Sequence, residues 1–508
     1  EGLQLVWFLH MISNLAGGSA MSFARFDQYM YPLYRKDLER GLMSREQAKQ
    51  LIECMWLKVN EPHMRTVQSM CLGGMRPDGS DGTNELTYVC LEVAADVQEP
   101  YPNTALRIHK GMPDELWSAA VAAIQTGTGQ PMMFNDDIMV RGLVHQGYPP
   151  EDARQYYPMG CVEVMIQGMQ PTYQGAGGQV FPQHVENVLD GVREGMEPGS
   201  FEEFLALVER SLRREVERTI RALEERAAAG DDDGPTDPFS SLLVDGCLES
   251  GRDVCRGGAK YSKSYVCNAM GLGTAVDSLA AIRKVVYEEG DLTLTELRKS
   301  LSEDFRGREA LRRKIVNATP KFGNDDAEVD AIARRLFCAF SSAATGYRSA
   351  VGHAYFPQMF SYHSHVWRGE SLGTTADGRL RGTAFSDGIG PSQGRDRRGP
   401  TALLRSVTRI DQSKLTGGCA LNVKLPAGVV TGRTGSRNLE GLLRGYFEEG
   451  GMQIQVNFVD QEVLRKAQEE PDAYRHVIVR VGGFCEYFCN LDRKLQEEII
   501  RRTSQELP

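Results

Sequence analysis

The chain has 508 residues, of which 41% are hydrophobic and 25% charged, as is typical of a soluble globular protein with one large domain or several. Its 58 basic and 68 acidic residues give a formal charge of −10, which argues against binding to nucleic acid. No apolar run approaches the roughly 18 residues that a membrane span requires.

Eleven cysteines are distributed singly along the chain, and no two of them form a C-x-x-C pair. This distribution favours neither a structural zinc site nor a disulfide framework. We therefore expect reduced thiols, no bound metal and a cytoplasmic protein.

The N-terminal part of the chain alternates between helix and strand signals. Ser44 to Gln47 has the pattern of a capping box, and apolar residues then recur at helical spacing, which predicts a helix over 44–60. The apolar run LTYVCLEVAADV, residues 86–97, is interpreted as a strand. Further strands are expected over 104–108 and 132–134, and helices over 113–124, after a cap at 135–137, and over 149–156.

The middle of the chain is predicted to be mainly helical. A helix is expected over 184–194, and Ser200 opens a long helix to about residue 229 whose charges form a solvated face. The stretch GDDDGPTDP, residues 230–238, has the composition of a linker and is interpreted as a surface loop rather than a domain boundary. Further helices are expected over 274–289, 293–302, 308–317 and 326–341.

From Ala402 to the end of the chain, strand and helix signals alternate again. Strands are expected in CALNVKL, MQIQVNFV and VIVRVGG, with helices over 437–448, over 460–468 and from about 491. There are no internal repeats. This alternation favours a layered α/β fold with the form of a barrel.

Two stretches far apart in the sequence carry the functional signal. In the first, residues 480–484 (RVGGF), an apolar strand leads into two glycines, which taken alone indicate only a positive φ angle or close backbone approach. The second, residues 159–164 (MGCVEV), places a cysteine and a carboxylate two residues apart, on the same side of an extended segment.

Together, these stretches resemble the glycyl radical enzymes, the family of pyruvate formate-lyase and the cobalamin-independent diol dehydratases. That family carries R-V-x-G-[FY] on a C-terminal loop and, in its dehydratase-like branch, G-C-V-E on a second loop. The resemblance covers nearly the whole chain and includes the blocks 243–261, 320–326 and 375–407.

The resemblance implies a ten-stranded α/β barrel, made of two antiparallel five-stranded halves surrounded by helices, inside which the two loops meet. It divides the chain into a pyruvate formate-lyase-like domain over 1–385 and a C-terminal glycine radical domain over 386–508. In the family, several hundred residues precede the cysteine loop, whereas here 160 do. We therefore expect this chain to be the C-terminal two-thirds of a longer protein, or one half of a split one.

The resemblance also assigns roles to three residues. Gly483 stores the radical, rather than Gly482, because the family motif places it at the fourth position. A radical on a glycine Cα is delocalised over the flanking amide groups, and no side chain forces it out of plane. Cys161 is then the thiol that exchanges a hydrogen atom with Gly483 and takes one from the substrate. Glu163 is the general base for a substrate hydroxyl beside a carbon radical.

Each assigned residue also has a simpler alternative role. Cys161 alone would be a small buried hydrophobe, and Glu163 a surface or helix-capping residue. His363 and His365, in SYHSHVW, are expected to line the substrate pocket. Their alternative is a structural role, and no third ligand is evident that would complete a metal site.

Two further positions bear on the type of reaction. Gly160 stands where pyruvate formate-lyase itself has a second cysteine, which disfavours acyl transfer and favours a lyase. Many family dehydratases carry an acid shortly after the cysteine loop, whereas residues 171–175 contain none. Either another proton donor serves a leaving water, or the leaving group is not water.

We predict a glycyl radical lyase of anaerobic metabolism, in the first place a dehydratase that acts on a small hydroxylated metabolite. It would hold no permanent cofactor, would be activated by a separate radical S-adenosylmethionine activase, and would be a homodimer. Alternatives are a radical decarboxylase, a C–C bond-forming enzyme or a formate C-acetyltransferase-like enzyme. From another class, the alternative is a non-catalytic radical-domain fragment.

Overall fold

The computed structural model describes residues 1–15, 20–61, 67–171, 174–192, 197–230, 236–261, 263–350, 352–426, 428 and 431–502. The chain forms two compact units. Unit 1 contains residues 1–167 and 422–500, and unit 2 contains residues 168–421. Unit 1 therefore joins the N-terminal part of the chain to its C-terminal end in one body.

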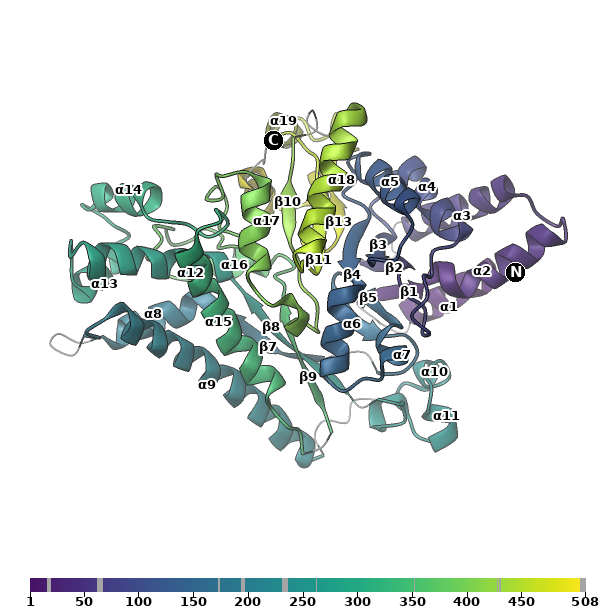
Figure 1. Cartoon of the computed structure of the whole chain (residues 1–508), viewed down its shortest axis with the longest axis horizontal. Coiled ribbons are helices and arrows are strands. Elements are labelled where there is room, and N and C mark those ends of the chain that lie inside the picture. The colour runs from purple at the N-terminus through teal and green to yellow at the C-terminus, as the bar shows by residue number, and fades with distance from the viewer. Residues whose placement is uncertain are drawn as a thin grey trace. The chain divides into compact units, whose positions relative to one another are not determined.

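Unit 1 is built on a six-stranded sheet in the order β1-β2-β3-β4-β11-β10. Strands β1 to β4 are parallel, β11 is antiparallel to β4, and β10 is parallel to β11. Two parallel groups of opposite direction thus join where β4 meets β11 (Figure 1). The strands are β1 (Met21–Arg25), β2 (Gln68–Gly73), β3 (Asn103–Ile108), β4 (Met132–Asn135), β10 (Asn422–Lys424) and β11 (Gln453–Asn457).

Two short antiparallel hairpins complete the strands of unit 1. One pairs β5 (Tyr156–Met159) with β6 (Glu163–Ile166), and the other pairs β12 (Ile478–Arg480) with β13 (Cys485–Tyr487). The tips of these hairpins are the two loops that the sequence singled out.

The helices of unit 1 begin where the sequence provides caps. Ser44 and Gln47 form the predicted capping box of α3, and Asn135 caps α6 by accepting a hydrogen bond from the Asp137 N–H. The predicted helix over 149–156 is shorter, because Tyr156 already begins β5. The helices are α1 (Gly2–Leu15), α2 (Phe26–Glu39), α3 (Arg45–Val59), α4 (Glu85–Val97), α5 (Asp114–Ile124), α6 (Asp136–His145), α7 (Pro150–Ala153), α18 (Gly432–Glu448), α19 (Gln461–Glu469) and α20 (Arg493–Arg501), with a 3-10 turn η5 (Phe488–Asn490).

The strand predicted over residues 86–97 is wrong, because this segment is helix α4. Asn84 caps the helix by accepting hydrogen bonds from the Leu86 and Thr87 N–H groups at 2.9 and 3.3 Å. Leu86, Val89 and Val93 share one buried face at helical spacing. The apolar run is also long for a strand, and its length and its cap favour a helix despite its β-branched residues.

Unit 2 contains a three-stranded parallel sheet in the order β7-β8-β9 and most of the long helices of the chain. Helix α9 packs against α15 and α8. The elements are β7 (Gln174–Val180), β8 (Ser264–Met270), β9 (Ala354–Met359), α8 (Phe181–Gly191), α9 (Phe201–Ala228), α10 (Pro238–Ser241), α11 (Cys247–Ser250), η1 (Val254–Arg256), α12 (Leu272–Ile282), the π-helix η2 (Arg283–Glu288), α13 (Leu294–Ser302), α14 (Glu309–Ala318), α15 (Ala327–Thr345), α16 (Ser364–Ser371), α17 (Pro400–Thr408) and η3 (Gln412–Lys414).

The helices predicted for unit 2 agree with the structure apart from their ends. The helix expected over 184–194 begins earlier, at Phe181, and the one expected over 274–289 changes to a π-helix at Arg283. Most of the linker-like stretch over 230–238 lies outside the described residues. All eleven cysteines are free thiols. Within the ranges described above, no helix is both long and apolar enough to cross a membrane.

Candidate functional site

The cysteine loop is the tip of the β5–β6 hairpin. Met159 pairs with Glu163, so that residues 160–162 form the turn between them. Gly160 has a φ of +64°, which glycine adopts without strain. Its N–H donates to Ser22 Oγ on β1 at 3.0 Å. The hairpin tip is therefore attached to β1, in the group of parallel strands β1 to β4.

The Glu163 carboxylate folds back over this turn. Its Oε2 accepts hydrogen bonds from the N–H groups of Cys161 at 3.1 Å and Val162 at 2.9 Å. Cys161 and Glu163 are both buried, with 5% and 7% of their surface exposed. A tight turn, and not the expected alternation along an extended segment, brings the two side chains together, because Gly160 reverses the chain just before the cysteine.

The Cys161 thiol is held in its neutral form. Burial raises its pKa well above the ordinary value, the Glu163 carboxylate raises it further, and the Arg480 guanidinium lowers it to a smaller extent. The thiol therefore keeps its proton at neutral pH. The neutral S–H can give up a hydrogen atom, whereas a thiolate would serve as a nucleophile or a metal ligand.

The glycine loop is the tip of the β12–β13 hairpin. Arg480 pairs with Cys485, and the Val481 N–H donates to the Phe484 carbonyl at 2.9 Å, which closes the tip. Gly483 is buried in this tip and has a φ of +81°. A residue with a Cβ would be strained in that conformation.

Arg480 holds the glycine loop from inside the protein. Its side chain is fully buried, and Nε donates to Gln455 Oε1 on β11 at 2.7 Å. Nη1 donates to Asn103 Oδ1 at 2.7 Å, and Nη2 to the Gly483 carbonyl at 3.2 Å. Asn457, also on β11, donates to the Arg480 carbonyl at 3.2 Å. The glycine loop is thereby attached to the C-terminal strands of the sheet.

Asn103, the first residue of β3, contacts both loops. Its Nδ2 donates to the Gly160 carbonyl at 2.8 Å and to the Gly483 carbonyl at 2.7 Å. The peptide that joins Gly160 to Cys161 and the glycine expected to carry the radical are thus bound by one amide nitrogen. The structure therefore brings together Cys161, Glu163 and Gly483, the three residues to which the sequence assigned chemistry.

Two residues join these loops, and no motif in the sequence assigns this role to either of them. Arg480 is a charged residue inside an apolar strand, a position that requires buried polar partners. Asn103 is a polar residue at the start of the apolar strand TALRI. Both signals were present in the sequence, but neither identifies its partner, because the partners are distant backbone carbonyls.

The two predicted substrate-contacting histidines lie in unit 2. His363 precedes α16, with its ring 4.4 Å from that of Tyr362. His365 is fully buried on α16, with Nδ1 3.9 Å from Asp387 Oδ1. Their contact with a substrate stays a prediction. In the part of the chain that the structure describes, no three His, Cys, Asp or Glu side chains group as a metal site would require.

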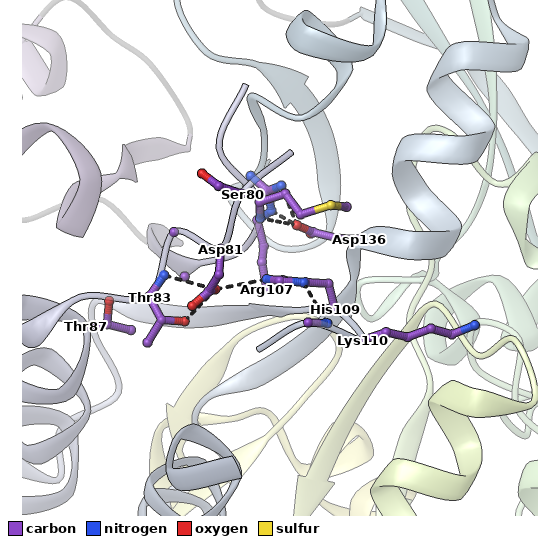
Figure 2. Close-up of polar contacts among 12 residues, drawn as sticks. Ser80, Asp81, Thr83, Thr87, Arg107, His109, Lys110 and Asp136 are labelled. Carbon is purple, nitrogen blue, oxygen red and sulfur yellow. Dashed lines mark hydrogen bonds and ion pairs between the residues drawn. The ribbon is translucent and has the colours of Figure 1, made fainter. Parts of the chain in front are cut away.

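A second polar cluster lies at the carboxyl end of β3 (Figure 2). Arg107 and Asp136 form a fully buried ion pair with two hydrogen bonds of 2.7 Å. His109 Nδ1 accepts from the Gly111 N–H at 3.1 Å, so Nε2 carries the proton and donates it to Asp81 Oδ1 at 3.0 Å. Both ring nitrogens are occupied, which indicates that this cluster fixes the loop around Asp81.

Comparison with known proteins identifies the class to which the chain belongs. Residues 1–369 match the pyruvate formate lyase-like family and residues 385–489 match the glycine radical family. The chain therefore belongs to the glycyl radical enzymes of the pyruvate formate lyase-like type, as its two loops predicted.

Three similar proteins show the range of this class. Trans-4-hydroxy-L-proline dehydratase of Clostridioides difficile is 34% identical over 99% of this chain and 67% of its own length. Isethionate sulfite-lyase of Bilophila wadsworthia is 31% identical over 100% of this chain and 65% of its own. The glycerol-bound structure of the B12-independent glycerol dehydratase of Clostridium butyricum is 32% identical, with a TM-score of 0.93 over 99% of this chain and 67% of that one. The predicted fold class, the α/β barrel type of the glycyl radical enzymes, is confirmed.

The chain spans about two-thirds of the length of these relatives. Two of these relatives are named as dehydratases and the third as a sulfite-lyase.

Proposed function

We propose that this chain carries the radical site of a glycyl radical lyase that eliminates water from a small hydroxylated metabolite. Gly483 stores the radical, Cys161 transfers hydrogen atoms, and Glu163 is the general base. The observation that carries this proposal is the shared amide of Asn103, bonded to the carbonyls of Gly160 and Gly483 at 2.8 and 2.7 Å. It supports a site in which thiol and glycine exchange hydrogen.

The first step moves the unpaired electron from glycine to sulfur. The Cys161 S–H bond breaks, a C–H bond forms at the Gly483 Cα, and a thiyl radical remains. The raised pKa of Cys161 supports this role, because the thiol keeps the hydrogen that has to be transferred. The thiyl then takes a hydrogen atom from the substrate carbon that bears a hydroxyl group, which restores the S–H bond and leaves a carbon radical.

The second step is the elimination. A hydroxyl beside a carbon radical is far more acidic than usual, so Glu163 takes its proton and a ketyl radical results. The ketyl expels hydroxide from the neighbouring carbon, and the proton goes to this leaving group to give water. The product radical takes a hydrogen atom back from Cys161, and the sulfur regains one from Gly483. One hydrogen atom has moved between adjacent carbons, and one water has left.

The partners of this reaction are part of the proposal. A separate radical S-adenosylmethionine activase would remove the first hydrogen atom from Gly483. His363 and His365 are predicted to contact the substrate. The predicted assembly is a homodimer, and the predicted location is the cytoplasm. The first domain is predicted to end at residue 385.

Anaerobic activation followed by electron paramagnetic resonance tests this function. We expect a doublet signal, from coupling to the one remaining α-hydrogen of Gly483, together with loss of water from hydroxylated substrates detected by mass spectrometry. Cys161→Ala should retain the doublet and lose all turnover. Turnover that survives in Cys161→Ala would overturn the mechanism, and Cys338→Ala, at a half-buried cysteine of unit 2, is the matched control.

A second candidate is elimination of a group other than water. Residues 171–175 contain no acid to protonate a departing hydroxide, and one similar protein is a sulfite-lyase. A leaving group such as sulfite departs as a stable anion and needs no proton. Parallel assays with a diol and with a hydroxysulfonate, each followed by detection of the carbonyl product, separate the two candidates.

A further inference from the structure

We propose that Asn103 is a positioning residue for hydrogen transfer, since its one side-chain amide holds the cysteine loop and the glycine loop at the separation at which hydrogen passes between Cys161 and Gly483. This inference rests on the proposed function. Asn103 takes no part in the bonds that break and form, but its loss should slow hydrogen transfer measurably.

The geometry singles out Asn103 because its two donors point to different loops. Nδ2 reaches the Gly160 carbonyl, in the peptide bonded to Cys161, at 2.8 Å, and the carbonyl of Gly483 itself at 2.7 Å. Each contact therefore lies within a few covalent bonds of a reacting atom. Hydrogen transfer depends steeply on the separation of donor and acceptor, and a displacement of about 1 Å can cost 10²-fold in rate.

The orientation of the Asn103 amide is itself fixed. Its Oδ1 accepts a hydrogen bond from Arg480 Nη1 at 2.7 Å, which assigns the oxygen to that side and both N–H groups to the two carbonyls. Asn103 is fully buried at the start of β3, in register with Ser69 on β2. A rigid strand therefore holds the amide, and the amide in turn fixes the positions of the two hairpin tips.

The bond to Gly483 also reaches the group that shares the unpaired electron. In a glycyl radical the flanking nitrogen donates electron density and the carbonyl withdraws it, so a hydrogen-bond donor on that carbonyl stabilises the delocalised radical. Asn103 Nδ2 and Arg480 Nη2 both donate to it, at 2.7 and 3.2 Å. Loss of one donor should change the spectrum of the radical as well as its rate of exchange.

Asn135 offers a matched control in the same sheet. Its Nδ2 also donates to two backbone carbonyls, those of Phe447 and Gly451, at 3.1 and 2.9 Å, and it is likewise buried. It lies at the end of β4 and contacts neither hairpin tip in these bonds. Asn135→Ala therefore removes the same kind of interaction from the same unit of the protein.

Deuterium entry into the radical glycine measures the transfer directly. In D₂O the Cys161 hydrogen exchanges with solvent, so each return transfer from Cys161 can place deuterium on the Gly483 Cα, and the doublet then collapses to a narrower line. The experiment activates the wild type, Asn103→Ala, Asn103→Asp and Asn135→Ala anaerobically, transfers each to D₂O, and follows the line shape. Asn103→Asp keeps the shape of the side chain and its acceptor for Arg480, but lacks the two N–H donors.

We expect both Asn103 variants to retain the radical, with an altered line shape, and to take up deuterium at least about tenfold more slowly, which corresponds to about 1.4 kcal/mol on the barrier. Asn135→Ala should unfold at a lower temperature and exchange at the wild-type rate. Wild-type exchange in the Asn103 variants, or an equal slowing in Asn135→Ala, would overturn the proposal. Loss of the radical in both Asn103 variants, but not in Asn135→Ala, would also overturn the proposal, since Asn103 would then act in radical formation. A wild type with no doublet or no exchange would instead contradict the proposed function.

Discussion

The two ends of strand β3 carry polar clusters of opposite character. At the carboxyl end, Arg107 and Asp136 form an ion pair with no exposed surface, and His109 is fixed by hydrogen bonds on both ring nitrogens. At the amino end, Asn103 donates to two backbone carbonyls. The first cluster pairs the Arg107 cation with the Asp136 carboxylate, whereas the second directs the Asn103 amide and the buried Arg480 guanidinium to neutral carbonyls.

This difference separates a structural cluster from the cluster proposed to react. At the carboxyl end the Arg107 and His109 side chains donate to carboxylates, and the second ring nitrogen of His109 is occupied by the Gly111 N–H. At the amino end the hydrogen bonds act on carbonyls beside the reacting atoms, and burial keeps the Cys161 thiol neutral. The proposed radical transfer requires a thiol that keeps its hydrogen and is held in place, and the contacts around Asn103 support this proposal.

The largest expected effect is that of Gly483→Ala. The φ of Gly483 is +81°, where alanine is strained, and a side chain on the radical carbon opposes planarity. We expect complete loss of the doublet and of turnover after anaerobic activation. The control is Gly482→Ala, because Gly482 does not have a positive φ and is not the predicted carrier. A doublet that survives in Gly483→Ala but disappears in Gly482→Ala would move the radical to the other glycine.

The next effect is that of Glu163→Gln, which separates base catalysis from radical transfer. The amide oxygen of glutamine can still accept from the Cys161 and Val162 N–H groups, so the turn should keep its shape. Without a base, turnover should fall about 10²- to 10⁴-fold, while the doublet and its deuterium exchange remain. Unchanged kcat would show that Glu163 only stabilises the turn.

Elements with local signals could be predicted from the sequence. The helix after Ser44 and the cap at Asn135 depend on side chains within one turn of the helix, and both predictions are confirmed. The wrong strand at residues 86–97 has a local cause too, because the Asn84 cap favours the helix that forms there. Strands β6 and β13, of four and three residues, were not predicted, because each carries too little periodicity of its own.

The residues of the candidate site also divide into those with a local sequence signal and those that depend on distant partners. Cys161, Glu163 and Gly483 could be proposed from the sequence because a family motif marks each position. Asn103 and the role of Arg480 were not found, since each depends on backbone carbonyls that only the folded chain brings near. Short motifs identify reacting atoms, whereas the groups that set the distance between those atoms are scattered over the sheet.

A smaller effect, confined to stability, is expected from Arg107→Met. It leaves Asp136 buried without its cation, which should lower the free energy of unfolding by about 3–5 kcal/mol. Replacement of both residues, Arg107→Met with Asp136→Leu, should recover much of this loss, because no charge is then left alone. Denaturant unfolding measures both variants. In the folded fraction, deuterium exchange at the radical should match the wild type, and a slowed exchange would mean that the carboxyl end of β3 also controls the loops.

The smallest effect expected is the absence of a pH response in deuterium exchange. A free thiol has a pKa of about 8.5, so an exchange that needs the S–H form would fall by half near that pH if Cys161 were ordinary. Burial and the Glu163 carboxylate raise the pKa of Cys161 well above this value, and hydrogen remains on sulfur. The rate should therefore stay constant from about pH 7 to about pH 9. In Glu163→Gln the anion is lost but burial remains, so the profile should stay flat there too. A decline centred near pH 8.5 in the wild type would mean that the loop admits water, and that the amino end of β3 is less protected than its hydrogen bonds indicate.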